Sequence, residues 1–244
     1  MNIALIGHGR MGKEVESLAA ERGIKVLKIF TSGNNPSGAG LTKESLKGVD
    51  ICIDFSTPAT VLGNIEAVVR AGKSMVVGTT GWHQQTEQVR ILVKKHTVGF
   101  LCSSNFSLGV NLLMQMVLDV AHLIDRYPEY DVAIHEVHHR GKGDSPSGTA
   151  LSLASIVLQS MKRKNTILHE TPRATLKPEE VHVTSTRVGH IVGKHTVLFD
   201  SEFDSIELVH TAKSRKGFAL GALVAAEWLK GKKGFYTMKD VILP

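Results

Sequence analysis

The chain has 244 residues, enough for one large or two modest domains, and its 42% hydrophobic and 21% charged residues are ordinary for a globular protein. No apolar run reaches membrane-spanning length, and the N-terminal MNIALIGHG has no basic leader or cleavage site, so we expect a cytoplasmic protein without a membrane partner. The net charge of +6 suits nucleic acid and anionic small molecules equally. Because the basic residues are scattered and the aromatic residues, 5% of the chain, do not cluster, we expect no nucleic-acid partner.

The first predicted element is a short strand, Asn2–Ile6, followed at once by GHGRMG and then by helical spacing of apolar residues up to Gly23. This places GxGxxG between a strand and a helix, the context typical of dinucleotide binding. The first glycine permits the tight turn, the second lets the backbone approach a pyrophosphate, and the third lets helix and strand pack closely. The sequence therefore predicts a dinucleotide site at its N-terminus.

The second predicted strand, Lys25–Phe30, bears on which dinucleotide binds. Proteins of this type that prefer NAD usually carry Asp or Glu near the end of this strand, to hold the ribose 2′-hydroxyl. Here Thr31 and Ser32 stand in that region, and with Lys28 they can hydrogen-bond a 2′-phosphate. No carboxylate repels such a phosphate, and no arginine is present to bind it. The prediction favours NADPH and leaves NADH open.

Three further strands and two helices complete the first half of the chain. Their alternation predicts a parallel sheet with right-handed crossovers. The polar segments FSTP, GTTG and SSNF each follow a strand, and in open α/β sheets ligands bind at that edge, although each segment alone is also an ordinary polar turn. The predicted strands are residues 51–55, 75–77 and 99–102, and the predicted helices are residues 60–71 and 84–95.

The alternation of predicted strands and helices ends near Ser107, where we place a domain boundary. A long amphipathic helix comes first, and a strand, a helix and three β-rich runs follow, which predict an antiparallel or mixed sheet. A closing helix and a short strand or extended tail complete the chain, and periodicity alone does not decide whether they return to the first domain. The expected segments are helices 109–124, 147–161 and 218–230, strands 131–137, 181–188, 194–200 and 205–211, and the tail 235–243.

The densest group of functional residue types is HEVHHRGKGDSPSGTA, from His135 to Ala150, in the loop after a half-buried strand. An imidazole can transfer a proton near neutral pH, and a lysine can bind a carboxylate or donate a proton. A helix that begins at Ser147-Gly148-Thr149 offers unpaired N–H groups that suit a carboxylate. The alternative is a solvated basic loop before a well-capped helix, which would explain any one of these residues but not the whole set.

Three other functions are compatible with parts of the sequence. A metal site built from His135, His138, His139 and Asp144 is disfavoured, because the pattern is strand then loop and no HExxH is present, so we expect no metal. A non-catalytic dinucleotide-binding sensor would lack the His-His-x-x-Lys cluster, which is intact here. Another two-domain dehydrogenase, acting on an amino acid or a sugar, is the remaining alternative among enzymes.

With GxGxxG, GTTG, SSNFSLGVN and EVHHRGKGDSPSGTA in this order, the chain resembles the 4-hydroxy-tetrahydrodipicolinate reductases, formerly called dihydrodipicolinate reductases, of the lysine pathway. The resemblance covers essentially the full length, and the last motif is highly specific. It implies an α/β fold in which a Rossmann-like parallel-sheet domain, residues 1–106, is rejoined by residues 215–244. Residues 107–214 then form an α+β substrate domain whose mixed sheet builds a homotetramer.

The resemblance also implies the chemistry. NADPH or NADH reduces a cyclic imine with two carboxylates, 4-hydroxy-2,3,4,5-tetrahydrodipicolinate, to tetrahydrodipicolinate with loss of water. By position, His138 matches the proton donor or acceptor and Lys142 the catalytic lysine. The substrate contacts match His139, Ser147, Gly148 and Thr149, and the cofactor contacts match Gly7, His8, Gly9, Arg10, Met11, Gly12, Gly78, Thr79, Thr80, Ser103, Ser104, Asn105 and Phe106.

Two departures from the family pattern stand out. The glycine loop is one residue shorter than the commoner form, which has an extra glycine before Arg-Met-Gly. The second strand lacks the frequent acidic or arginine residue, so the choice between NADPH and NADH depends on Thr31 and Ser32.

Overall fold

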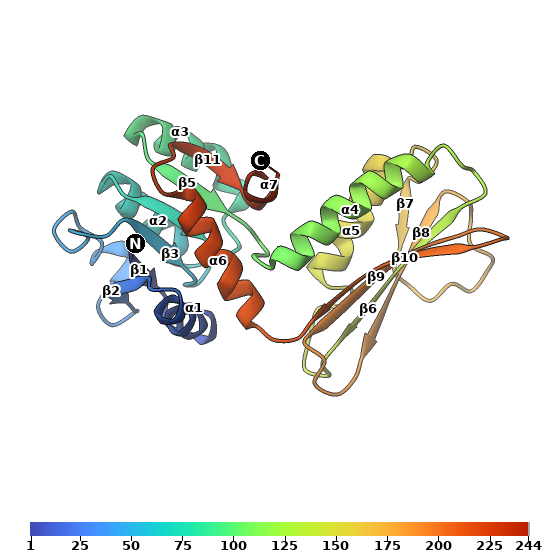
Figure 1. Cartoon of the computed structure of the whole chain (residues 1–244), viewed down its shortest axis with the longest axis horizontal. Helices are drawn as coiled ribbons and strands as arrows, with labels where there is room; N and C mark the ends of the chain where they lie inside the picture. Colours follow the sequence, from blue (N-terminus) through green and yellow to red (C-terminus); the bar gives the residue numbers. More distant parts are fainter. Residues whose placement is uncertain (244) are drawn as a thin grey trace. The chain divides into compact units, whose positions relative to one another are not determined.

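The computed structural model describes residues 1–243, and the chain divides into two compact units (Figure 1). Unit 1 comprises Met1–Leu108 together with the chain from Arg215 onward, and unit 2 comprises Gly109–Ser214. Pro244, the last residue of the segment expected to rejoin the first domain, lies outside the described residues. Within the described chain, no helix has both the length and the apolar character that crossing a membrane requires.

Unit 1 is built on a six-stranded sheet with the strand order β11-β5-β4-β3-β1-β2. All of its neighbouring strands run parallel, so the chain crosses over the sheet between successive strands. The predicted Rossmann-like parallel sheet is confirmed. The strands are β1 Asn2–Ile6, β2 Lys25–Phe30, β3 Ile51–Asp54, β4 Ser74–Val77, β5 Gly99–Cys102 and β11 Gly234–Thr237.

Helices cover both faces of this sheet. Alternate residues of β1 enter two different cores: Ala4 and Ile6 pack with α2 and α3, whereas Ile3 and Leu5 pack with α1 and α6. Strands buried on both faces are expected to be apolar throughout, as β3 is. The helices are α1 Arg10–Glu21, α2 Val61–Arg70, α3 Thr86–His96, α6 Lys216–Leu229 and α7 Met238–Ile242, with short 3-10 turns η1 Pro36–Gly38 and η2 His83–Gln85.

The C-terminal tail corrects one prediction. Its first part is the expected strand, β11, which pairs with β5 at the edge of the unit 1 sheet, and Phe235 stacks on Phe100 at 5.1 Å between ring centroids. Its second part is helical rather than extended. The Thr237 backbone N–H donates to the Asp240 carboxylate at 2.8 Å in a capping box that starts α7, a local signal that outweighs the β-type composition of the tail.

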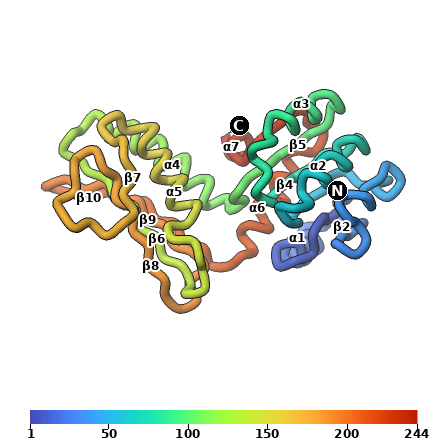
Figure 2. The backbone as a smooth tube through the Cα atoms, turned by 180° about the vertical axis from the view of Figure 1, so that it is seen from behind, coloured from blue at the N-terminus to red at the C-terminus, as the bar shows by residue number. Residues whose placement is uncertain are grey.

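Unit 2 contains a five-stranded mixed sheet in the order β10-β9-β6-β8-β7 (Figure 2). The central strand β6 runs parallel to β8 and antiparallel to β9, so the consecutive strands β8 and β9 are separated by β6. Apolar residues of α4 and α5 pack with this sheet in one core. The three-residue strand β7 lies where only a loop was predicted. The elements are α4 Leu108–Ile124, β6 Asp131–His138, α5 Gly148–Ser160, β7 Thr166–Leu168, β8 Glu180–Arg187, β9 Gly193–Asp200 and β10 Ser205–Ala212.

Candidate active site

The glycine loop between β1 and α1 is held in shape by two of its glycines. Gly7 has φ +87°, and a Cβ atom there would lie 2.4 Å from the carbonyl oxygen of Phe55. A Cβ atom on Gly12 would lie 2.2 Å from the carbonyl oxygen of Gly7. Gly9, at the N-cap of α1, has open space where its Cβ would be. The fold therefore requires the first and third glycines, whereas the second leaves the backbone accessible.

A cavity of about 500 Å³ lies beside this loop. Of the predicted cofactor residues, Gly7, His8, Gly9, Thr31 and Ser32 line it, whereas Arg10, Met11 and Gly12 do not. An imidazole nitrogen of His8 lies 2.7 Å from the Glu16 carboxylate. The segment FSTP, predicted to lie at the ligand-binding edge, supplies Phe55, Ser56 and Thr57 to the lining. The lining outside the predicted segments consists of Ile6, Lys13, Phe30, Asn35, Thr60 and Asn64.

A buried carboxylate, Asp54, organises the polar residues at one end of β3. Its Oδ1 accepts hydrogen bonds from the backbone N–H and hydroxyl of Ser56, at 2.9 and 2.7 Å, and from the hydroxyl of Thr79 at 2.6 Å. Its Oδ2 accepts from the Asn64 amide at 2.9 Å, and Asn64 in turn accepts from Asn35 at 3.0 Å. Because Ser56, Asn35 and Asn64 also line the cavity, this network fixes part of its wall.

The remaining predicted cofactor residues follow β4 and β5 and do not line the cavity. A Cβ atom on Gly78 would lie 2.1 Å from the ring of Phe55, so this glycine makes room for an aromatic side chain. Phe106 is buried and packs edge-to-face on Phe55 at 5.9 Å. Thr80 and Ser104 are exposed, and Ser103 and Asn105 are half-buried in the turn after β5.

In unit 2, the buried face of β6 changes from apolar to polar along the strand. Val132 and Ile134 belong to the core, and two residues further along the same face come Glu136 and then His138, both buried. The strand register places Glu136 opposite Ser185 of β8 and opposite His195 of β9. Residues opposite each other in a sheet share a face, so these polar side chains converge.

Glu136 is fully buried, and one of its oxygens is saturated with donors. Oε1 accepts from the backbone N–H of Ser147 at 3.0 Å, the hydroxyl of Ser185 at 2.8 Å and the guanidinium of Arg187 at 2.7 Å. Burial alone would raise the pKa of Glu136, but hydrogen bonds from Ser147, Arg187 and Ser185 outweigh it and lower the pKa to about 2. The side chain is therefore an anion at neutral pH.

The other oxygen of Glu136 faces two histidines. Oε2 lies 3.1 Å from Nδ1 of His138 and 3.7 Å from Nε2 of His195, and the two rings pack edge-to-face at 5.1 Å. Burial lowers the pKa of His138, while the Glu136 charge opposes that shift. Burial, reinforced by His138, lowers the pKa of His195 to about 4. This arrangement turns Nδ1 of His138 toward the carboxylate and leaves Nε2 as the nitrogen available to a ligand.

The loop after β6 holds the other predicted catalytic and substrate residues. The Lys142 ammonium donates to both oxygens of Asp144, at 2.7 and 2.9 Å. Ser147 is the N-cap of α5: its hydroxyl accepts from the Ala150 N–H at 3.2 Å. His139 and Thr149 are half-buried and Gly148 is exposed. The predicted helix N-terminus is therefore present, within one residue of the sequence-based boundary.

The alternative metal cluster is not assembled. His135 is exposed and contacts Thr184, and Asp144 is engaged by Lys142. In the part of the chain that the structure describes, three groups with ligand-type atoms within 4.8 Å of one another occur together only at Glu136, His138 and His195. The Glu136 carboxylate of this group is also paired with the Arg187 guanidinium at 2.7 Å, and we refer to the three residues as the charge network.

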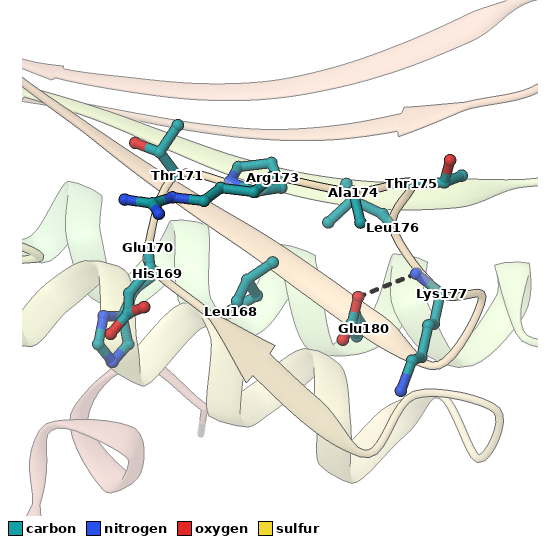
Figure 3. Close-up of a pocket in the computed structure, with 11 residues that line it drawn as sticks. Leu168, His169, Glu170, Thr171, Arg173, Ala174, Thr175, Leu176, Lys177 and Glu180 are labelled. Atoms are coloured by element: carbon teal, nitrogen blue, oxygen red, sulfur yellow. Dashed lines mark hydrogen bonds between the residues drawn. The ribbon is translucent and has the colours of Figure 1, made fainter.

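A larger cavity, of about 750 Å³, lies elsewhere in unit 2 (Figure 3). It is lined by the loop between β7 and β8, where the backbone N–H of Lys177 donates to the Glu180 carboxylate at 2.9 Å. None of the predicted site residues lines it. The candidate site is therefore placed at the glycine loop and at the end of β6, and not in the larger cavity.

The sequence did not identify several residues of these sites. Arg187 and His195 lie on strands far from His138 in the sequence, and only the strand register brings them together. Asp54 ends an apolar strand, and Lys13 lies on the exposed side of α1. A signal was available for Asp54 and Glu136, because each is a single carboxylate within a buried strand, where an unpaired charge is costly.

Both parts of the chain match models of one protein family. Residues 1–106 match the family described as dihydrodipicolinate reductase, N-terminus, and residues 109–242 match dihydrodipicolinate reductase, C-terminus. A 4-hydroxy-tetrahydrodipicolinate reductase of Christiangramia forsetii is 41% identical over 99% of this chain and 98% of that protein. Another from Aquifex aeolicus is 38% identical over 96% of this chain and 95% of its own.

Solved structures show the same fold. A dipicolinate-bound dihydrodipicolinate reductase from Paenisporosarcina sp. TG-14 superposes with a TM-score of 0.79 at 24% identity, with 98% of each chain covered. A C. glutamicum DAP dehydrogenase in complex with DAP gives a TM-score of 0.56 at 16% identity, covering 100% of this chain and 93% of that one. With both family matches and near-complete coverage by relatives of about 40% identity, the chain belongs to the dihydrodipicolinate reductase family.

Proposed function

We propose that this chain catalyses the NAD(P)H-dependent reduction of 4-hydroxy-2,3,4,5-tetrahydrodipicolinate to tetrahydrodipicolinate, with loss of water, in lysine and diaminopimelate biosynthesis. Relatives that match nearly the whole chain bear the name of this reductase. The observation that carries the proposal is the charge network at the end of β6. It joins His138 to the Ser147 turn through the single carboxylate of Glu136.

Unit 1 is the proposed dinucleotide-binding unit. Its glycine loop and adjacent cavity suit a dinucleotide, since Gly9 and the first N–H groups of α1 are open to a pyrophosphate and Thr31, Ser32 and Lys13 stand around the cavity. When bound, the nicotinamide supplies the hydride. We retain Arg10, Met11, Gly12, Gly78, Thr79, Thr80, Ser103, Ser104, Asn105 and Phe106 as proposed positions of this site, with Gly12, Gly78, Thr79 and Phe106 acting through the fold that they hold.

Unit 2 is the proposed substrate-binding unit. His138 donates a proton from Nε2 to the ring atom that becomes electron-rich on reduction. Lys142 binds a substrate carboxylate, which takes the place of Asp144 as its anionic partner. The N–H groups at the start of α5, at Gly148 and Thr149, the capping residue Ser147 and the His139 imidazole hold the substrate carboxylates.

The decisive experiment follows NADPH, and then NADH, by absorbance with freshly generated hydroxytetrahydrodipicolinate, made from pyruvate and aspartate semialdehyde by the synthase. We expect oxidation that depends on the substrate, and the ratio of the two rates gives the cofactor preference. Absence of oxidation with both cofactors, while both still bind, would contradict the proposal and favour a dinucleotide sensor.

The proposed role of His138 has its own test. We expect His138→Ala to lower kcat about 100-fold or more, because it removes a general acid, while the Kd for NADPH changes less than about twofold. Steady-state kinetics and fluorescence titration measure the two quantities. Equal losses in turnover and cofactor affinity would show that His138 supports the fold instead.

We also propose a homotetramer and a cytoplasmic location. The apolar side chains of Ile206 and Val209 are exposed on β10, which lies at one edge of the unit 2 sheet, and Phe203 is exposed just before it; a subunit interface would cover them. Both cysteines are free thiols, as expected for a reducing compartment. Light scattering should give four times the 26.5 kDa mass of one chain, and cell fractionation should recover the protein with cytoplasmic markers.

A further inference from the structure

We propose that Glu136 is the positioning residue of the reductase: its buried carboxylate stabilises the protonated form of His138 and ties that proton donor to the turn that binds the substrate carboxylates. The inference rests on the proposed function and deepens it, because it assigns a role to a residue outside the family motif's proton donor and lysine. It follows from the different partners of the two carboxylate oxygens of Glu136.

Oε1 serves the scaffold. Its three donors come from the N-cap of α5, from β8 through Ser185, and from the Arg187 guanidinium, which also donates to the carbonyl of Asp144 at 2.6 Å. One oxygen therefore fixes the start of α5 and the loop before it relative to the sheet.

Oε2 has no aligned hydrogen-bond donor, and neither has Nδ1 of His138, although the two atoms are 3.1 Å apart and both are buried. Leaving two buried polar atoms unpartnered is costly in the resting protein. A negative charge at this distance attracts an imidazolium and not a neutral ring, so the Glu136 carboxylate favours the protonated form of His138.

The other charged groups around His138 make this carboxylate necessary. Lys142, in the following loop, and Arg187, on β8, both disfavour a positive charge on His138. His195, on β9, has a pKa of about 4 and therefore adds no charge beside His138 at neutral pH. Asp144 favours the charge but is bound by Lys142 at the surface. Glu136 is therefore the one buried anion, among the described residues facing His138, that favours a proton on its ring against burial and two cations.

The test compares Glu136→Gln with Ser185→Ala. E136Q keeps the size and an acceptor oxygen but removes the charge, whereas S185A removes one donor to Oε1 and leaves the charge in place. For E136Q we expect kcat to fall about 10- to 100-fold at neutral pH, and the descending alkaline limb of the kcat–pH profile to move to lower pH, because the proton donor loses its proton more easily. For S185A, which keeps the charge, we expect the alkaline limb to stay at the wild-type pH, whatever the loss in kcat.

Two readouts separate this inference from the proposed function and from loss of fold. The Kd for NADPH, a property of unit 1, should stay unchanged in both variants. Titration of the His138 ring by NMR should show a lower pKa in E136Q than in the wild type, whether or not the protein reduces this substrate. If E136Q does not fold, Glu136→Asp is the substitute, because it keeps the charge but moves it away from Nδ1. The alkaline limb of the kcat–pH profile and the pKa of the His138 ring should then both move to lower pH, by a smaller amount than expected for E136Q.

The inference is overturned if E136Q, or E136D in its place, lowers kcat with the alkaline limb and the His138 titration both unchanged. Glu136 would then be only a scaffold residue. A wild-type protein that oxidises neither cofactor, but whose His138 titration responds to E136Q as described, would instead contradict the proposed function and leave the coupling intact.

Discussion

At the scale of single residues, two buried carboxylates organise the two candidate sites. Asp54 ends β3 and collects donors from Ser56, Thr79 and Asn64, while Glu136 lies near the end of β6 and collects three donors from two other segments, the N-cap of α5 and β8. Each carboxylate is fully buried, where an unpaired charge would be strongly unfavourable. Their donors must therefore stay in place, which gives each site a fixed shape before any ligand arrives.

Glu136 also makes stability depend on pH. Its pKa falls from an ordinary 4.5 to about 2 on folding, so the stabilisation is fully present above pH 4.5 and is lost as the pH falls toward 2. We expect roughly 3 kcal/mol of the unfolding free energy to disappear across that window. Urea denaturation at pH 6, 4.5 and 3 measures it. E136Q should show a shallower decline, and an identical decline would contradict this assignment.

The choice of cofactor depends, we expect, on Lys13 rather than on Lys28. Lys13 lines the cavity with Thr31 and Ser32, whereas Lys28 does not. Lys13→Ala should raise the KM for NADPH about 3- to 10-fold, the loss of one charge-assisted hydrogen bond, with little effect on NADH. Lys28→Ala is the matched control. An equal change with both cofactors would show that Lys13 does not contact the 2′-phosphate.

At the scale of elements, hydrophobic periodicity predicted most helices and strands, whereas the pairing of distant residues could not be predicted from the sequence. The strands and helices of unit 1 were predicted within a few residues because buried parallel strands alternate with amphipathic helices. β7 was missed because three residues carry too little pattern, and α7 because its signal is one capping box. Ser185, which pairs with Glu136 across 49 residues, was not predictable, since register is set by the assembled sheet.

Two glycines of the glycine loop are expected to be needed for different reasons, Gly12 for the fold and Gly9 for cofactor binding. Gly12→Ala places a Cβ atom 2.2 Å from a backbone oxygen, so we expect the Tm to fall by roughly 3–10 °C and NADPH affinity to fall with it. Gly9→Ala meets open space, so the Tm should stay within about 2 °C while NADPH affinity drops. Calorimetry and fluorescence titration give both quantities. Unchanged affinity in G9A would show that no pyrophosphate approaches this backbone.

At the scale of the whole molecule, unit 1 is discontinuous in sequence. The C-terminal segment supplies α6, with seven buried residues, and the edge strand β11, so the N-terminal half alone has neither a complete core nor a complete sheet. Unit 2 is inserted between these two parts. Both units keep their own hydrophobic cores, which is the usual mark of separate domains.

Deletion of the chain from Gly234 onward tests the contribution of the last elements. It removes the Phe235–Phe100 stack and the buried Met238 side chain and leaves β5 as an exposed edge. We expect a loss of about 3 kcal/mol of unfolding free energy, from one buried and one half-buried large side chain together with the lost strand pairing. Urea denaturation checks it, with Leu243→Ala, at an exposed position, as control. A truncated protein of unchanged stability would contradict the proposed role of β11.

The interrupted sequence of unit 1 also sets the order in which the protein can fold on the ribosome. Residues 1–108 emerge first but lack α6, so they must wait, with apolar strands incompletely covered, while the whole of unit 2 is synthesised. Unit 2, which is continuous, can fold as soon as it has emerged. The parallel pairing of β5 with β11 closes last, across a loop of more than a hundred residues, and such distant contacts form slowly. We therefore expect newly made chains to pass through a state in which unit 2 is native and unit 1 is open to aggregation or to chaperones.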